Sequence, residues 1–262
     1  MRVLDLFSGI GGFSLGLERA GMQTVAFCET ERYCRAVLGK HWPKVARFKD
    51  VRYLTTAKLK PFLPIDVISA GFPCQDVSQA GRKLGIEGNR SGLWTEAYRL
   101  IGELRPIYAI MENVSALLIR GVERVLGDLA ALGYDAQWHC IPASHVGGIQ
   151  ERDRIWIIAY LGGERGQRLV ESLYSGPLGQ GWMRSEADLQ SILDAPLEPG
   201  HSWPQPIVRG MDGRIRHRIH RMRALGNSVY PQIPEIIGKA ILQAEGLIRP
   251  ARQGVNTRRM NW

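Results

Sequence analysis

The pattern of apolar and polar positions over the first 160 residues alternates between short apolar runs, typical of buried strands, and amphipathic stretches, typical of helices. Residues 3–7 predict a first strand, which a glycine-rich turn and a helix over 13–20 follow. Three further segments have the apolar composition of strands, 24–28, 66–70 and 108–111, and a helix over 93–104 separates the last two. Strands separated by helices predict an α/β fold class, with a doubly wound, mostly parallel sheet.

The pattern changes toward the end of this region. Residues 134–141 alternate with period two and 154–160 are apolar and β-branched, and the short link between them predicts an antiparallel pair at a sheet edge. Residues 161–206 are rich in Gly, Ser and Pro and predict no regular element. An amphipathic helix is expected over 233–244, with Pro231 and Pro234 suited to its start.

Composition places the chain among soluble globular proteins. Its 262 residues are 45% hydrophobic and 23% charged, which excludes wholesale disorder. The longest apolar run, 155–163, is too short for a membrane span of about 20 residues, and the N-terminus has no signal-peptide pattern. The chain has four cysteines without the spacing of a metal site, Cys28, Cys34, Cys74 and Cys140, so no metal is expected. Unpaired cysteines of this kind suit a protein in the reducing cytoplasm.

Positive charge is concentrated at one end. Residues 201–262 have 11 Lys and Arg against 3 acidic residues, whereas residues 1–200 have 23 against 22. A basic end of this kind indicates a polyanionic partner or a solvated tail, and charge alone does not decide between them.

The glycine-rich turn, DLFSGIGGF (5–13), lies between a strand and a helix, where glycine lets a ligand approach the backbone. Glu29 follows the second strand, at the position that holds ribose hydroxyls in such folds. A purely structural turn would have a similar sequence. The spacing is not GxGxxG, which disfavours a nicotinamide oxidoreductase.

Cys74, in GFPCQ (71–75), follows a buried strand at the edge of the sheet where ligands bind in open α/β folds. Pro73 fixes the backbone before the thiol, which favours a nucleophile over a buried apolar residue. Residues 76–90 are small, polar and Gly-rich, and suit either a lid or a plain surface loop.

Two further groups suit acid–base and charge chemistry. Glu112 is expected directly after the strand 108–111, as a proton donor or as the carboxylate of a helix N-terminus. In QERDR (150–154), alternation places Gln150, Arg152 and Arg154 on one face, either in a site or at a charged strand entry.

Together these segments resemble the DNA cytosine-5 methyltransferase family. The resemblance covers about residues 3–160 and 222–245, and its overall size is similar to compact phage and prophage members. The matching segments occur in the family's order: DLFSGIGGF (5–13), Glu29, Asp50, GFPCQDVS (71–78), ENV (112–114), QERDR (150–154) and ALGNSVYPQ (224–232).

The resemblance implies methylation of C5 of cytosine in a specific duplex DNA sequence, with S-adenosylmethionine as cofactor and with the base flipped out of the duplex. Cys74 would add to C6 as the nucleophile, Glu112 would protonate N3, and Arg152 and Arg154 would hold the base and the active-site loop. The residues that would border the cofactor are Phe7, Gly9, Gly11, Gly12, Glu29, Asp50, Pro73, Leu93, Asn227 and Val229.

The same resemblance implies three parts. Residues 1–160 and 222–247 would form the catalytic domain, 161–221 a small irregular target-recognition region, and 248–262 a basic tail. The residues expected to contact DNA, the arginines mainly through phosphate, are Gln75, Ser78, Arg82, Lys83, Arg209, Arg214, Arg216, Arg218 and Arg221.

Two alternatives stay open at the level of sequence: an RNA cytosine-5 methyltransferase of the same fold, and a catalytically silent DNA-binding regulator. The expected partner is double-stranded DNA and not a membrane, and the family expectation is a monomer. We expect a cytoplasmic, nucleoid-associated protein in a bacterial or phage-infected cell. Restriction–modification, with a paired restriction endonuclease, and phage self-protection are the two expected contexts.

Overall fold

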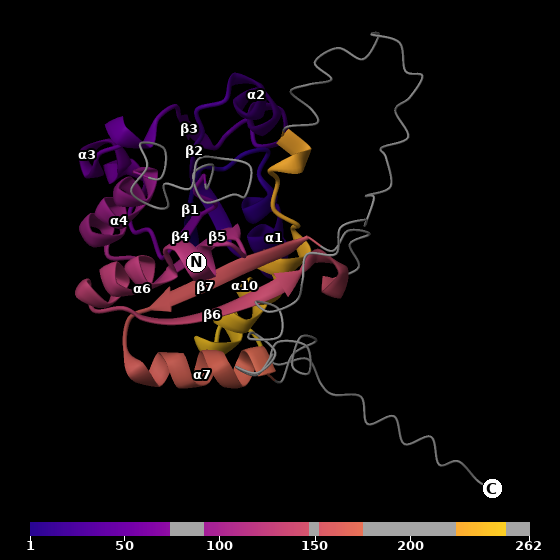
Figure 1. The fold of residues 1–262 in the computed structure, drawn as a ribbon. Coiled ribbons are helices and arrows are strands. Elements are labelled where there is room, and N and C mark those ends of the chain that lie inside the picture. The colour runs from indigo at the N-terminus through magenta and orange to yellow at the C-terminus, as the bar shows by residue number, and fades with distance from the viewer. Residues whose placement is uncertain (74–91, 147–151, 175–223, 250–262) are drawn as a thin grey trace, which may run out of the picture.

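A computed structural model describes residues 1–73, 92–146, 152–174 and 224–249 of the chain, and a seven-stranded sheet forms its centre (Figure 1). The order of the strands across the sheet is β3-β2-β1-β4-β5-β7-β6. The strands are β1 (Arg2–Leu6), β2 (Gln23–Cys28), β3 (Ala46–Phe48), β4 (Val67–Ala70), β5 (Tyr108–Val114), β6 (Asp135–Pro142) and β7 (Asp153–Tyr160).

The sheet is mixed in the way the sequence predicts. The five strands from β3 to β5 are parallel, whereas β7 runs antiparallel to both β5 and β6. The expected antiparallel pair is therefore confirmed, and β6 is the edge strand.

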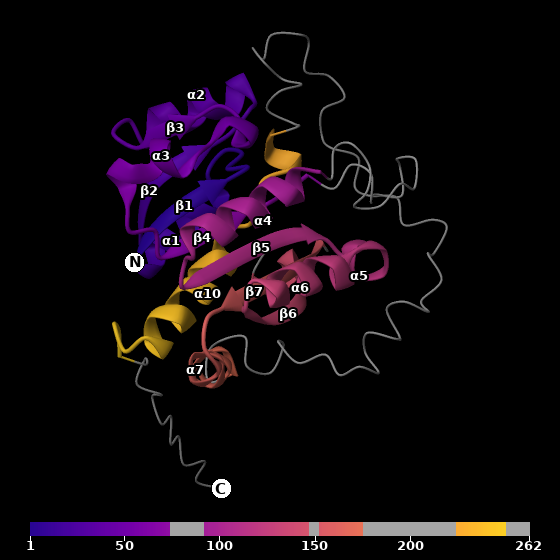
Figure 2. The same ribbon diagram turned by 90° about the vertical axis from the view of Figure 1, so that its left-hand side faces the viewer.

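Helices cover both faces of the sheet (Figure 2). α1, α7 and α10 pack with one buried cluster, and α4 and α6 pack with the other. The described residues include the α-helices α1 (Gly12–Ala20), α2 (Arg32–His41), α3 (Thr56–Leu59), α4 (Leu93–Leu104), α5 (Leu117–Arg120), α6 (Val122–Ala131), α7 (Gly163–Tyr174) and α10 (Gln232–Ala244). Short 3-10 helices are η1 (Val51–Tyr53), η2 (Lys60–Phe62) and η4 (Ala143–Val146).

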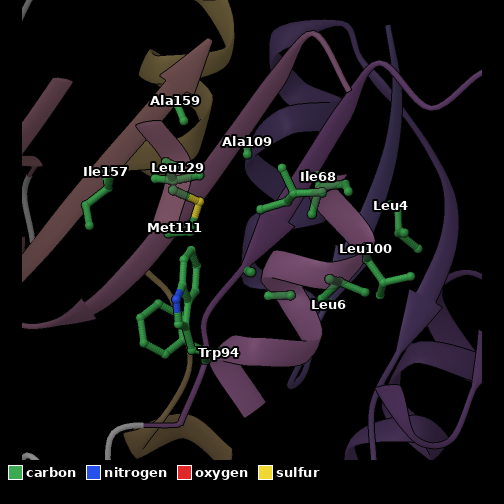
Figure 3. Packing of buried hydrophobic residues seen from close by; sticks show 14 of the residues in the cluster. Leu4, Leu6, Ile68, Trp94, Leu100, Ala109, Met111, Leu129, Ile157 and Ala159 are labelled. Atoms are coloured by element: carbon green, nitrogen blue, oxygen red, sulfur yellow. The ribbon is translucent and has the colours of Figure 1, made fainter. Parts of the chain in front are cut away.

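The larger cluster is a continuous apolar layer between the sheet and the helices α4 and α6. Figure 3 shows Leu6 and Ile68 of the sheet facing Leu100 of α4, with the Trp94 ring nearer to Met111. The indole Nε1 of Trp94 donates a 2.8 Å hydrogen bond to Asp128 of α6, so this buried polar atom is satisfied. The layer fixes α4 against the sheet.

Two glycines let α1 and α10 approach each other closely. A Cβ on Gly12 would lie 2.4 Å from the backbone oxygen of Val229, and one on Gly16 would lie 2.2 Å from that of Pro231. Segments more than 200 positions apart in the chain are therefore in direct contact. This contact places the segment before α10 beside the glycine-rich turn.

The structure corrects the expected end of one strand. β5 continues to Val114, so Glu112 lies within the strand and not after it. β4 ends at Ala70, which pairs with Met111, and Glu112 is therefore the first residue of β5 beyond the end of β4. The strand continues because β7 pairs with it as far as Val114.

The structure also shows a helix where the sequence predicted no element. α7 lies within 161–206, and its Leu169 and Leu173 are buried in the cluster that includes α10. The salt bridge Arg165–Glu245, with 2.6 Å between Nε and Oε1, fastens α7 to the end of α10. The sequence of α7 does not predict a helix because it contains two glycines and several charged residues. Packing against α10, rather than helix propensity, stabilises this helix.

The division into a catalytic domain, a recognition region at 161–221 and a tail at 248–262 stays a prediction, since most of the last two parts lies outside the described residues. Within 161–221, α7 packs on the sheet and on α10 through this buried cluster. No helix among the described residues has the length and apolar character that a membrane span requires.

Candidate active site

A cavity of about 440 Å³ lies at the carboxyl ends of β1, β2, β4 and β5. Such a position is where open α/β sheets bind ligands. Its wall consists of Phe7, Gly9, Cys28, Glu29, Thr30, Glu31, Tyr33, Cys34, Val51, Gly71, Phe72, Pro73, Leu93, Glu112, Asn113, Val114, Arg152, Arg154, Ala224 and Asn227.

The glycine-rich turn forms one side of the cavity. Phe7 has a positive φ of 54°, which is unusual for a residue with a side chain. The turn is held by hydrogen bonds from the backbone N–H of Ser8 to Cys28, at 3.2 Å, and from that of Gly11 to Ser8, at 2.8 Å. Gly11 has a φ of 91°, and a Cβ there would lie 2.7 Å from the Trp42 ring, so only glycine fits.

A buried polar cluster supports this turn from below. Asp5 of β1 is fully buried, and its two carboxylate oxygens each accept a 2.8 Å hydrogen bond, one from Ser14 of α1 and one from Ser69 of β4. Burial raises the pKa of Asp5 to about 7. The cluster ties α1 to the two central strands directly beneath the cavity.

Glu29 connects two loops at the rim of the cavity. Its Oε2 accepts a 2.7 Å hydrogen bond from the backbone N–H of Gly9, and its Oε1 accepts one of 2.7 Å from Glu31. Glu29 is 9% exposed, so the carboxylate is held almost entirely by protein groups. Each oxygen retains acceptor capacity for a hydroxyl group of a ligand.

The segment that leads to Cys74 is fixed from two sides. The Phe72 ring lies against Trp94, with 5.3 Å between ring centroids, and the Phe72 carbonyl accepts a 3.3 Å hydrogen bond from Nδ2 of Asn113. Both Phe72 and Asn113 are buried. Residues 71–73 therefore reach the cavity in a defined position, and Cys74, the next residue, lies outside the described part.

Glu112 and Arg154 form an ion pair in the cavity wall, beside Gly71. The distance between Oε1 of Glu112 and Nε of Arg154 is 3.0 Å, and the two side chains are 11% and 23% exposed. Across the ladder Glu112 faces Trp156 and Val114 faces Arg154, so both charged side chains lie on one face of the sheet. Burial raises the pKa of Glu112 and outweighs the opposing effect of Arg154 and Arg152.

Arg152 links this side to the segment before α10. Its Nη1 donates a 3.5 Å hydrogen bond to the carbonyl of Leu225. Burial and the neighbouring Arg154 lower the pKa of the Arg152 guanidinium, which shows how closely the two cations are placed. The cavity thus has a carboxylate and two guanidinium groups at one end and the Glu29 carboxylate at the other.

Most of the described residues predicted for the site meet around this cavity. Glu112, Arg152 and Arg154 line it, and so do six of the ten residues predicted to border a cofactor, Phe7, Gly9, Glu29, Pro73, Leu93 and Asn227. The other four, Gly11, Gly12, Asp50 and Val229, lie behind or beside this lining. Their cofactor roles stay predictions.

Asp50 has a different set of contacts from those expected for a cofactor ligand. Its carboxylate accepts hydrogen bonds from the backbone N–H and the guanidinium of Arg52, with 2.6 Å between Oδ2 and Nη2. This pairing lowers the pKa of Asp50. The next residue, Val51, lines the cavity instead.

The residues predicted to contact DNA all lie outside the described residues. They are Gln75, Ser78, Arg82, Lys83, Arg209, Arg214, Arg216, Arg218 and Arg221. Their roles remain predictions.

The structure adds wall residues that the sequence did not predict for the site, among them Cys28, Tyr33, Cys34 and Asn113. Burial raises the pKa of Cys28 to about 12, so this thiol acts as an apolar wall group. Tyr33 and Cys34 follow Glu29 closely in the chain, and Asn113 follows Glu112. Their positions close to Glu29 and Glu112 in the sequence were the signal from which a place in the cavity wall could have been predicted.

Comparison with known proteins identifies the family. The family model of the C-5 cytosine-specific DNA methylases matches residues 1–198, so the chain belongs to this family. The family uses S-adenosylmethionine as its cofactor.

Individual relatives agree with this family. The type II methyltransferase M2.BsuMI of Bacillus subtilis (strain 168) is 37% identical over 169 residues, which are 62% of this chain and 42% of the relative. M.Eco47II of Escherichia coli is 34% identical over 99% of this chain and 61% of the relative. The chain spans about half the length of the curated relatives it matches.

The fold agrees with a solved structure. A protein described as a DNA modification methyltransferase encoded within an E. coli prophage matches with a TM-score of 0.51 and 29% identity, over 62% of this chain and 47% of that one. The architecture is the Rossmann-like fold of S-adenosylmethionine-dependent methyltransferases.

Proposed function

We propose that the protein transfers a methyl group from S-adenosylmethionine to C5 of cytosine in a specific duplex DNA sequence. The observation that carries the proposal is a single cavity that joins the Glu29 carboxylate at one end to the Glu112–Arg154 pair at the other. A methyl donor and a flipped base need to meet in one such space. Family membership adds the substrate class.

The residues of the cavity fit the cofactor. Phe7 and Val51 offer apolar surface for a flat base, and Glu29 offers two carboxylate oxygens for ribose hydroxyls. A Cβ built on Gly9 would meet nothing within 4 Å, so the backbone there is open to a ligand. When bound, S-adenosylmethionine supplies an electrophilic methyl group on a positively charged sulfur.

The chain's own groups would activate the cytosine. In this mechanism the Cys74 thiolate forms a bond to C6 while Glu112 gives a proton to N3, which makes C5 electron-rich. The raised pKa of Glu112 suits a proton donor near neutral pH. After methylation, loss of the C5 proton, release of the Cys74 sulfur as a thiolate and return of the N3 proton to Glu112 would yield 5-methylcytosine.

The arginines would hold the reacting base. Arg154 lines the cavity and is fixed by Glu112 and by the Asp153 carbonyl, and its other N–H groups would donate to a base oxygen. Flipping the base out of the duplex costs a few kcal/mol, which contacts of this kind offset. The arginine-rich residues 209–223 would supply phosphate contacts.

The biological setting that we propose is restriction–modification or phage self-protection, in the cytoplasm and in association with the nucleoid. The relatives M2.BsuMI and M.Eco47II carry type II methyltransferase names, which supports the first of these. A monomer and a paired restriction endonuclease are further parts of the proposal.

The test is methyl transfer from labelled S-adenosylmethionine to unmethylated duplex DNA, with Cys74→Ser as the inactive variant. We expect label in DNA with the wild type and none with Cys74→Ser. Bisulfite sequencing of the product should then show protected cytosines in one sequence context. Cys140→Ser is the matched control, since Cys140 of β6 does not line the cavity, and it should keep full activity.

Two other results would favour the alternative functions. Label in RNA but not in DNA would show an RNA methyltransferase. No label in either nucleic acid, with intact DNA binding, would show a catalytically silent regulator.

A further inference from the structure

A strongly basic segment lies inside the part of the chain whose overall charge is close to zero. Residues 32–60 have nine Lys and Arg and one acidic residue, Asp50. Residues 1–31 and 61–200 have 14 basic and 21 acidic residues. The near balance over 1–200 therefore conceals a local net charge of +8.

The structure gathers these charges at one end of the sheet. β3 is the edge strand opposite β6, and Figures 1 and 2 both show α2, β3 and α3 together at that end. Eight of the nine basic side chains are exposed, and we call them the β3-edge basic surface: Arg32, Lys40, Lys44, Arg47, Lys49, Arg52, Lys58 and Lys60.

Most side chains of this surface have no carboxylate partner among the described residues. Among the residues that the structure describes, the one ion pair of the β3-edge basic surface joins Arg52 to Asp50, at 2.6 Å. The other anchored cations are held by neutral carbonyl groups. Lys58 Nζ donates to the carbonyl of Tyr53 at 2.7 Å.

Arg47 shows this arrangement most clearly. Its Nη1 donates to the carbonyls of Trp42 at 3.0 Å and Val45 at 3.2 Å. A Cβ on Gly39 of α2 would lie 3.5 Å from the Arg47 Cζ, so the guanidinium lies directly over this helix. Carbonyl oxygens orient the cation and leave its charge available to an external anion.

We propose that the β3-edge basic surface binds the phosphate backbone of duplex DNA outside the methylated target. The proposal rests on the proposed function for the choice of DNA and adds a second contact with it. Four strand spacings of about 4.8 Å separate β3 from β5, the strand of Glu112, which is roughly 19 Å. About six base pairs of B-DNA span the same length, so a duplex that extends beyond the flipped base can reach this end of the sheet.

The test compares two triple variants that remove the same charge. Lys40→Gln/Lys44→Gln/Lys49→Gln removes three lysines for which no hydrogen bond or ion pair is found within the described residues. The control, Arg19→Gln/Arg124→Gln/Lys239→Gln, removes three cations outside this surface, on α1, α6 and α10, each of which pairs with Glu235 or Asp128. Binding of a duplex of about 40 base pairs is measured between about 50 and 200 mM salt.

Log affinity falls as log salt rises, and we expect this fall to be less steep in the lysine variant. The size of the slope should decrease by about 2 to 3, at ~0.9 for each lost phosphate contact. Its affinity at intermediate salt should fall about ten- to hundredfold, while the control stays close to wild type. Equal slopes for the two triple variants would overturn the proposal.

Two companion measurements separate the possible failures. The cofactor affinity and the melting temperature of the lysine variant should equal those of the wild type, which excludes a loss of fold. Because binding requires no chemistry, a reduced slope in a protein that fails to methylate DNA would uphold this surface and reject the proposed reaction.

Discussion

Glu112→Gln is expected to lower kcat for methyl transfer by about 10²- to 10⁴-fold, the usual contribution of general acid catalysis. The amide keeps the shape of the side chain but cannot give a proton to N3. It also leaves Arg154 without the carboxylate that lies 3.0 Å from its Nε. The affinity for S-adenosylmethionine should stay within a few-fold of the wild type, because Glu29 is at the other end of the cavity.

The pH dependence gives a second readout for Glu112. Burial raises its pKa, and the protonated form is the donor, so the kcat/KM of the wild type should fall as the pH rises through this raised pKa. The variant should lack that limb. Glu96→Gln is the matched control, since Glu96 pairs with Arg99 on α4 at 2.8 Å and does not line the cavity. Equal kcat losses in the two variants would contradict the assigned role.

Gly16→Ala is expected to lower the free energy of unfolding by about 1–3 kcal/mol, the usual cost of overpacking, and by more if α10 cannot move. The new Cβ would lie 2.2 Å from the backbone oxygen of Pro231, 2.7 Å from Pro234 Cγ and 2.9 Å from the backbone nitrogen of Glu235. All three atoms belong to the start of α10, so α1 and α10 would have to separate. Urea unfolding measures the change.

The matched control for this prediction is Gly127→Ala on α6. A Cβ there would meet no heavy atom within 4 Å, and alanine is the better helix former by about 1 kcal/mol, so the variant should be as stable as the wild type or more so. Because α10 follows the segment that carries Asn227, Gly16→Ala should also weaken cofactor binding. Gly16→Ala at wild-type stability would show that the α1–α10 contact is not closely packed.

The sequence predicted the elements whose apolar pattern is local. The helix over 93–104 has the predicted bounds, and the six predicted strands differ from the observed ones by one to three residues at an end, whereas β3 was not predicted. The antiparallel pair β6 and β7 also follows from its alternation and its short link. Such patterns are determined by which face of each element is buried, and that information lies within a few residues.

The features that the sequence could not predict depend on distant partners. α7 owes its burial to α10, and β5 continues to Val114 because β7 pairs with it. The Asp50–Arg52 pair is local, but a sequence match does not show that the carboxylate is already engaged. The sequence predicted nine residues that line one cavity, whereas the contact between α1 and α10, which brings the segment of Asn227 to that cavity, could not be predicted.

Covalent trapping on a duplex that contains 5-fluorocytosine, in the presence of S-adenosylmethionine, tests the central claim most directly. Fluorine at C5 cannot leave as a proton does, so the bond between the Cys74 sulfur and C6 should persist after methyl transfer. We predict a protein–DNA adduct that survives denaturing electrophoresis with the wild type and with Cys140→Ser, and that is absent with Cys74→Ser. An adduct with Cys74→Ser, or methylated DNA without any adduct in the wild type, would contradict the account.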